Sequence, residues 1–214
     1  MARYSGSSWR SFRPEGAAAS ASAGAAAPRA VLAVQCRILG LDPGSLRTGY
    51  GVIDCGSAGE QHVAHGCINA GSGDFLVRLR RIYDAVTVLI AEHRPDEIAI
   101  ERVFVHRNPD SALKLGQARG AAICAAVGLG ASAFEYAPRA IKLAVSGFGA
   151  AEKLQVARMI TTLLRLERRP AADAADALAV ALCHAQTRRL AALISAPRTR
   201  RVVSVRAPRP GLRA

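Results

Sequence analysis

The chain has 214 residues, half of them hydrophobic, and a formal net charge of +13. This length suits one domain with a substantial core plus tails, and it excludes folds that need a second, duplicated domain. Residues 1–36 contain four Arg and one Glu, and residues 187–214 contain eight Arg and no acid, so only +2 remains for residues 37–186. The total favours a polyanionic partner, but nucleic-acid binding has to be inferred from a site as well.

The five cysteines are scattered and form no Cys-x-x-Cys pair: Cys36, Cys55, Cys67, Cys124 and Cys183. This pattern disfavours a disulfide framework or a zinc ribbon and is typical of a reduced cytosol. Cys183-His184 suggests a metal site, but without a second pair we interpret the two as a core thiol and a helix-end histidine. No apolar run is long enough for a membrane span, so we expect a cytoplasmic protein with no membrane partner.

Both ends of the chain differ in composition from the middle. Residues 1–36 are rich in Ala and Ser, and we expect a disordered extension, although an organelle transit peptide or a start codon set too far upstream remains open. Residues 187–214 are rich in Arg and punctuated by Pro, which is typical of a disordered tail that adds sequence-independent DNA affinity or only solubility. Residues 37–186 are left as the folded domain.

The first half of this domain predicts three strands, a helix and a fourth strand. Residues 38–41 and 49–54 are apolar runs joined by a Gly-bearing loop, which indicates a hairpin, and residues 60–70 can add a third antiparallel strand. A helix follows and ends before Pro95, with these apolar side chains on one face: Phe75, Leu76, Leu79, Ile82, Val86, Leu89 and Ile90. Residues 97–101 then form a short buried strand that ends in an acid.

The second half predicts a helix over residues 109–128, a strand over 132–137 and two further helices. Residues 151–166 are amphipathic, and we expect these side chains to face inward: Leu154, Val156, Ile160, Leu163 and Leu164. Residues 169–189 form an Ala-rich helix with Pro170 in its first turn. Three strands followed by alternating helices and strands predict an α/β fold with a sheet of mixed strand direction.

Four carboxylates are predicted to meet at one edge of this sheet. Asp42 and Glu101 each end an apolar strand, and strands linked through a helix are usually parallel neighbours. Asp173 and Asp176 lie three residues apart on the last helix, on a face that must be buried because alanines surround it. Four carboxylates in one place repel one another strongly unless a cation lies between them.

The residue types indicate which cation this is. Oxygen ligands without a Cys or His cluster favour Mg²⁺ or Mn²⁺, and two such ions hold the attacking and leaving oxygens of an in-line phosphoryl transfer. Taken singly, Asp42 can cap a turn, Glu101 can pair with an Arg, and Asp173 can complement the helix dipole. Asp176, one turn into an Ala-rich helix, is the hardest to explain without a shared site.

Four segments resemble the RuvC family of bacterial Holliday-junction resolvases, in order and at similar spacing: LGLDPGSLRTGYGVID, IAIERVFVHRNPDSALKLGQARG, FEYAPRAIKLAVSGFGAAEKLQV and AADAADALAVALCHA. The resemblance covers about residues 37–186. It implies an RNase H-like fold with a five-stranded mixed sheet flanked by helices. It also implies a homodimer whose two sites nick symmetric strands of a four-way DNA junction in recombination and repair. A bacterial, nucleoid-associated protein that works with a branch-migration motor complex is implied as well.

Carried over residue by residue, the resemblance assigns four catalytic, Mg²⁺-binding acids: Asp42, Glu101, Asp173 and Asp176. It implies two ions per active site, with Mn²⁺ as a substitute. It assigns DNA contacts to Phe104, Arg107, Lys142 and Lys153. Phe104 would stack on an unpaired base, although a core position is the alternative. Lys142 and Lys153 would otherwise be ordinary solvated lysines.

Two other functions remain as alternatives. A smaller RNase H-like family that processes ribosomal RNA shares a strand ending in Asp-Pro-Gly, but we would not expect it to have the SALKLGQARG helix. A protein that binds junctions without cutting them would be expected to have lost its carboxylates, and all four are present.

Overall fold

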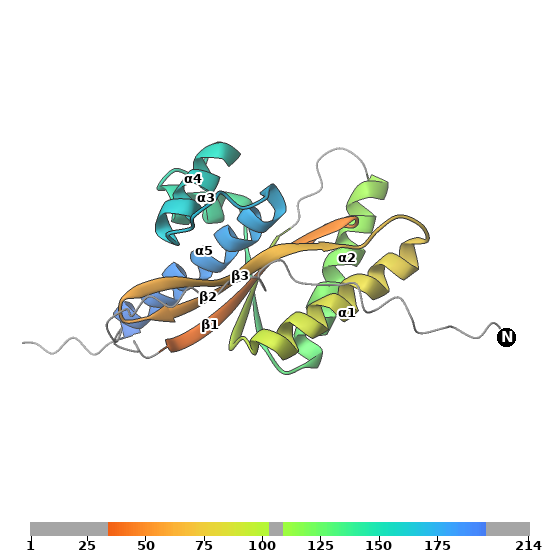
Figure 1. Ribbon diagram of the computed structural model, residues 1–214, viewed down its shortest axis with the longest axis horizontal. Coiled ribbons are helices and arrows are strands. Elements are labelled where there is room, and N and C mark those ends of the chain that lie inside the picture. Colours follow the sequence, from red (N-terminus) through yellow and green to blue (C-terminus); the bar gives the residue numbers. More distant parts are fainter. Residues whose placement is uncertain (1–33, 103–108, 196–214) are drawn as a thin grey trace, which may run out of the picture.

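A computed structural model describes residues 34–102 and 109–195 of the protein (Figure 1). The strands are β1 (Val34–Asp42), β2 (Arg47–Gly56), β3 (Gly59–Asn69), β4 (Glu97–Glu101) and β5 (Ser132–Tyr136). The helices are α1 (Phe75–His93), α2 (Pro109–Gly128), α3 (Pro138–Ser146), α4 (Lys153–Leu163) and α5 (Ala172–Ser195). The elements therefore extend past residues 37 and 186, where we placed the ends of the folded domain.

The five strands form one mixed sheet in the order β3-β2-β1-β4-β5. β1, β2 and β3 are antiparallel neighbours, whereas β4 lies parallel to β1 and β5 lies parallel to β4. The mixed α/β sheet and the hairpin expected from the sequence are confirmed. Helices α3, α4 and α5 cover one face of the sheet, and α1 and α2 cover the other (Figure 1).

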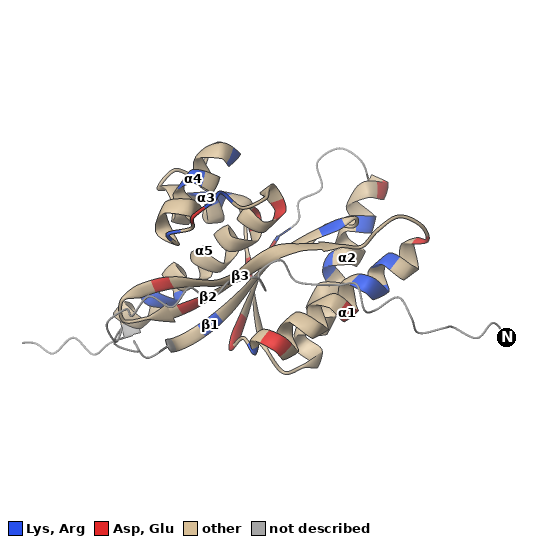
Figure 2. Ribbon diagram, viewed as in Figure 1, with Lys and Arg blue, Asp and Glu red and all other residues tan. Residues whose placement is uncertain are grey.

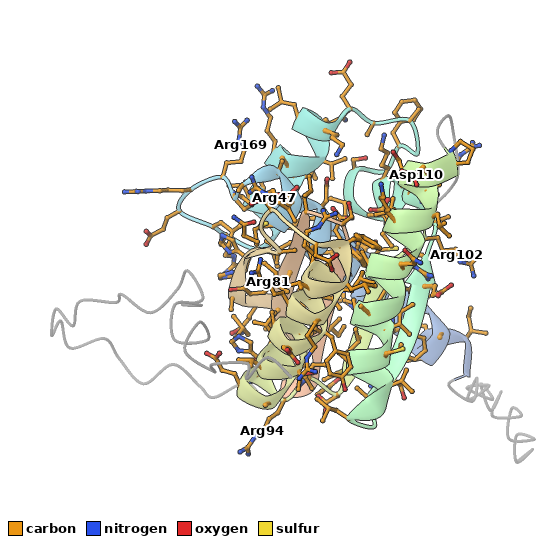
Figure 3. All side chains as sticks on the ribbon, turned by 90° about the vertical axis from the view of Figure 1, so that its right-hand side faces the viewer. Arg47, Arg81, Arg94, Arg102, Asp110 and Arg169 are labelled. Carbon is orange, nitrogen blue, oxygen red and sulfur yellow. The ribbon has the colours of Figure 1, made fainter. Side chains whose placement is uncertain are left out.

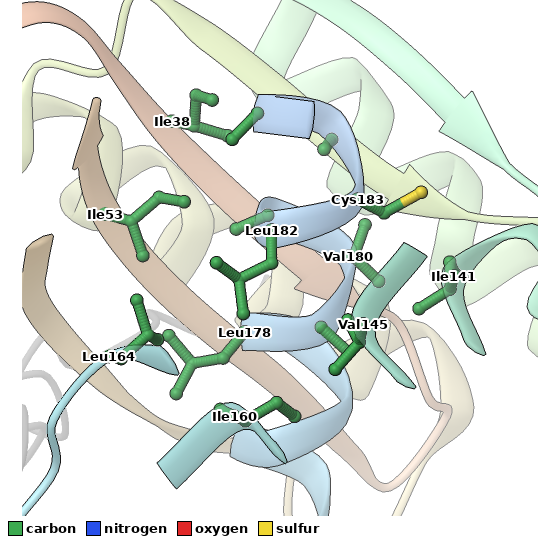
Figure 4. Close-up of a cluster of buried hydrophobic side chains, with 14 of the residues drawn as sticks. Ile38, Ile53, Ile141, Val145, Ile160, Leu164, Leu178, Val180, Leu182 and Cys183 are labelled. Carbon is green, nitrogen blue, oxygen red and sulfur yellow. The ribbon is translucent and has the colours of Figure 1, made fainter. Parts of the chain in front are cut away.

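Alternation along β1 divides the core into two layers. Ile38 packs beneath α5, and Leu39 and Leu41 pack beneath α1 and α2, because successive strand side chains point to opposite faces. The layer under α5 is drawn in Figure 4, where Leu178 and Leu182 of α5 lie among side chains of the sheet and of α3 and α4. Within the described residues, no helix is both long enough and apolar enough to span a membrane.

Helix α5 lies unusually close to β1 and β2 because glycines replace side chains beneath it. A Cβ atom on Gly40 would lie 2.8 Å from the backbone nitrogen of Ala181 and would also collide with the carbonyl oxygen of Ala177. At Gly49 it would collide with the backbone of Asp173. The first turns of α5 therefore rest directly on the strand backbone, which fixes the height of this helix above the sheet.

A chain of polar side chains centred on the buried His184 attaches the middle of α5 to β4 and β5. Tyr136 Oη lies 2.6 Å from His184 Nδ1, and His184 Nε2 lies 2.7 Å from a carboxylate oxygen of Glu97. Burial lowers the pKa of His184, and the hydrogen bond to Glu97 opposes that change. Cys183 is a buried core thiol as expected, but His184 lies mid-helix because α5 continues to Ser195. Neither residue forms a metal site within the described chain.

Three details differ from the sequence expectations. Helix α3 was not expected, although Pro138 at its first turn and the left-handed Gly147 at its end are typical helix boundaries. Pro170 lies two residues before α5 rather than in its first turn. Leu76, Leu154 and Leu163 are exposed rather than inward, because α1 and α4 are each covered along a narrow stripe only.

Replacing Gly40 by Ala should lower the free energy of unfolding by about 3 kcal/mol, because overpacking against backbone cannot be relieved by a rotamer change. Gly116→Ala in α2 is the matched control, since open space surrounds that position and Ala favours a helix by about 1 kcal/mol. Urea unfolding of both variants measures the difference. Equal stability of the two would contradict the close packing described for α5.

Candidate active site

The two strand-end acids lie side by side. Asp42 is the last residue of β1 and Glu101 the last residue of β4. These strands are parallel, and Leu41 pairs with Ile100, so both acids emerge at the same sheet edge. Their carboxyl groups lie within hydrogen-bonding reach of each other.

Hydrogen bonds from Thr48 and from Arg78 of α1 stabilise the turn after Asp42. Thr48 Oγ1 accepts a hydrogen bond from the Gly44 nitrogen at 3.3 Å and donates one to the Gly44 carbonyl oxygen at 3.2 Å. Arg78 of α1 donates to the carbonyl oxygen of Ser45 at 3.0 Å. The turn therefore holds the carboxyl end of β1 in place, which positions Asp42.

The first turns of α5 bring the other two acids to the same edge. Asp173 lies directly above Gly49, and Gly49 is the β2 partner of Asp42. Asp176 follows one turn later and acts electrostatically on both Asp42 and Glu101. The structure therefore brings the four acids of the sequence prediction to one place.

The acids at this edge repel one another. Burial raises the pKa of Asp42 to about 6; the charges of Asp176 and Asp173 add to this effect, and Lys153 opposes it. Burial, followed by the charges of Asp42 and Asp176, raises the pKa of Glu101 to about 7. A shared proton is one way to relieve such repulsion, and a bound cation is another.

Two basic side chains partner the α5 acids. Lys153 Nζ, at the start of α4, lies 2.9 Å from an Asp176 carboxylate oxygen, and this contact raises the pKa of Lys153. Arg47 Nε lies 2.7 Å from an Asp173 carboxylate oxygen. Cys67 Sγ lies 3.4 Å from the same oxygen and donates to it. Lys153, expected to contact DNA, therefore touches the acid cluster directly.

Sequence reasoning missed Arg47 and Cys67. They come together because β3 pairs with β2 in a register that places Cys67 opposite Gly49 and Asn69 opposite Arg47. The Gly-containing turn between the strands does not reveal this register from the sequence. Of the remaining expected DNA contacts, Lys142 is half-buried on α3, with no ion pair to a described carboxylate. Phe104 and Arg107 lie outside the described residues.

No group of three or more Asp, Glu, His or Cys side chains in the described ranges has an arrangement that could hold a metal ion. Asp173 and Asp176 are instead paired with Arg47 and Lys153. The residues nevertheless fit a hard divalent cation. Asp42 and Glu101 are half-buried, burial and neighbouring carboxylates raise the pKa of both, and the donor set is all oxygen.

A mixed five-stranded sheet flanked by helices, with acids at the ends of two parallel central strands, defines a protein of the RNase H-like fold. The sequence profile of the family described as "Crossover junction endodeoxyribonuclease RuvC" matches residues 38–184. The chain belongs to this family.

Relatives of the same description are similar over most of their length. The protein from Alkalilimnicola ehrlichii is 57% identical over 148 residues, which cover 69% of this chain and 90% of that protein. The protein from Halorhodospira halophila is 55% identical over 156 residues, which cover 71% of this chain and 91% of that protein.

Solved structures agree with this assignment. Thermus thermophilus RuvC matches with a TM-score of 0.67 and 32% identity, over 72% of this chain and 96% of that chain. The same protein in complex with Holliday junction substrate matches with a TM-score of 0.69 and 32% identity, over 73% and 97% of the two chains. The yeast mitochondrial resolvase Ydc2, at 12% identity and a TM-score of 0.54, shares the fold.

Asp42→Asn should raise the free energy of unfolding of the metal-free protein at pH 8 by about 2 kcal/mol, because it removes a half-buried charge that neighbouring carboxylates repel. Since the folded pKa values of Asp42 and Glu101 lie above their usual values near 4, wild-type stability from this pair falls as pH rises from about 4 to about 7. The gain should therefore shrink toward pH 5.

Chemical unfolding at several pH values measures this dependence. Asp84→Asn is the control, because that acid pairs with Arg80 on α1, outside the acid cluster. A gain that stays constant with pH would rule out electrostatic repulsion at Asp42 as its cause.

Proposed function

We propose that this protein is an endonuclease that resolves four-way (Holliday) DNA junctions in recombination and repair. The observation that carries the proposal is the half-buried Asp42–Glu101 pair next to Asp173 and Asp176, within the region that matches the RuvC family. The likeness to Thermus thermophilus RuvC in complex with Holliday junction substrate supports the choice of substrate.

The four acids would hold Mg²⁺, with two ions per site and Mn²⁺ as a substitute. Such ions, when bound, polarise the scissile phosphate and activate the attacking water. Asp42 and Glu101 supply oxygens at the floor of the site, and Asp173 and Asp176 supply oxygens from α5. Lys153, next to Asp176 and largely exposed, is placed to contact a phosphate that enters the site.

Paired, symmetric nicking requires two sites, so the protein would act as a homodimer. Helix α2 is the candidate dimer surface, because its outward side exposes Leu113 and Val127. Apolar side chains exposed on one helix are typical of a surface that a partner covers.

The remaining assignments complete the proposal. Phe104 would stack on an unpaired base at the crossover, and Arg107 and Lys142 would contact the DNA backbone. The protein would act in the bacterial cytoplasm at the nucleoid, together with the motor complex that drives branch migration.

Asp176→Asn should lower junction cleavage by about 10³-fold or more, because it removes a charged metal ligand from α5. Junction binding should persist, since the substitution removes negative charge from a DNA-binding surface. The measurement is a denaturing gel of a labelled synthetic four-way junction with Mg²⁺, with linear duplex of the same sequence and the variant Asp84→Asn as controls.

Paired, ligatable nicks in the junction, made by wild type and Asp84→Asn only, are the expected result. Cleavage by Asp176→Asn at the wild-type rate would refute the site assignment. Binding without nicks in every protein, over a range of Mg²⁺ and Mn²⁺, would favour a junction-binding protein that does not cut.

Mg²⁺ should stabilise the wild-type protein against unfolding, because an ion that binds only the folded state shifts the equilibrium. The gain is about 1.4 kcal/mol at ten times the dissociation constant. The double variant Asp42→Asn/Asp176→Asn should show no such gain. Thermal melts over a Mg²⁺ series measure it without relying on activity, and an equal shift in both proteins would place the ion elsewhere.

A further inference from the structure

An open groove of about 1190 Å³ lies between β3 and the loop that joins α4 to α5. One side is formed by residues 58–62 and His65, and the other by residues 163–169. The loop leads within a few residues to Asp173, and Cys67 of β3 contacts the same acid. We call this feature the basic groove.

A bulge in β3 shapes one side of the groove. Gly51 pairs with His65 and Ile53 pairs with His62, although the register between Val52 and Ile53 is shifted by one residue. Residues three apart in a regular strand point to opposite faces. The extra residue, Val63, lets both histidines face the groove instead. Their rings meet, with 2.7 Å between His62 Nε2 and His65 Nδ1.

The loop contributes the positive charge. Arg165, Arg168 and Arg169 are exposed, and none forms an ion pair with a carboxylate in the ranges that the structure describes. The loop is anchored at both ends, because Leu164 and Pro170 are buried. Figure 3 labels Arg169 on this loop. Three guanidinium groups are therefore held on a short, anchored segment.

The acids of the groove do not cancel this charge. Glu60 is already paired with Arg189 of α5, at 2.7 Å. Glu167 is the remaining acid among the lining residues, against three Arg. Elsewhere Lys and Arg occur on the helices of both layers (Figure 2), but Arg37, Arg80 and Arg119, for example, are paired with acids. The basic groove brings together three exposed Arg within residues 165–169, none of them in an ion pair with a described carboxylate.

We propose that the basic groove binds the sugar–phosphate backbone of a DNA arm as it leaves the active site. This inference rests on the proposed function. The guanidinium group of Arg matches phosphate in shape and charge. From Cys67 to His62 the strand covers about 17 Å, which corresponds to about five base pairs of duplex at 3.4 Å each.

The position of the groove favours DNA over an acidic protein segment. His65 is the β3 lining residue nearest the acids, two residues before Cys67, which contacts Asp173, so a duplex held at the acids and extended along β3 would pass this groove. The Arg-rich residues 196–214 carry the same sign of charge as the groove and would be repelled from it. An acidic protein segment that followed the same path would be repelled by the carboxylates of the acid cluster.

The test is the salt dependence of junction binding by Arg168→Gln/Arg169→Gln. Each phosphate contact contributes about 0.9 to the slope of log affinity against log salt, so the slope should become shallower by about 2 for each bound subunit. Affinity at 0.1 M salt should fall by about tenfold or more. Neutral methylphosphonates placed two to five base pairs from the cut site should weaken wild-type binding but not binding by the variant.

The matched control is Arg80→Gln/Arg94→Gln, which removes the same charge from exposed positions on α1 and just after it, on the other face of the sheet. It should retain the wild-type slope. An equal change of slope in both double variants, or an unchanged slope in Arg168→Gln/Arg169→Gln, would overturn the inference while wild-type junction cleavage upheld the proposed function. Wild-type protein that neither binds nor cuts junctions would overturn both.

Discussion

The close approach of α5 to β1 and β2 is the constraint on which the rest of the structure depends. Gly40 and Gly49 leave no side chain between the helix and the strand backbone, so the helix cannot be displaced outward without losing these contacts. This height places the first turns of α5 beside the carboxyl end of β1. Asp173 and Asp176 consequently lie beside Asp42 and Glu101, and the acid cluster is a direct result of backbone packing.

The acid cluster destabilises the folded protein, whereas the packing of α5 on the sheet stabilises it. Asp42 and Glu101 are partly desolvated and surrounded by other carboxylates, which raises the pKa of both, while Arg47 and Lys153 partner the α5 acids. Groups that destabilise a fold are retained where chemistry needs them. The same four acids that strain the metal-free protein form an all-oxygen set suited to a divalent cation, and the basic side chains around them suit a phosphate.

Much of the fold and two of the site's strand ends could be predicted, because they depend on local sequence patterns. Short apolar runs that end at Asp42 and Glu101, and the helical period around Ile82 and Val86, depend on near neighbours in the chain. The inward face of α4 was only partly predicted: Val156 is buried, but Leu163 is not. Helix α4 is short and packs mainly on α3 and α5. The helical period of the sequence does not show how wide a stripe of α4 these neighbours cover.

The sequence by itself determined the mixed α/β order, the four carboxylates and the strand ends that carry two of them, because strand and helix periods are properties of the chain. Only the tertiary structure decided which groups meet the acids. Cys67 and Arg47 reach Asp173 through the β2–β3 register, and His62 meets His65 through a bulge in that register. Register and interlayer distance arise from contacts between residues distant in the sequence, so no local pattern contains them.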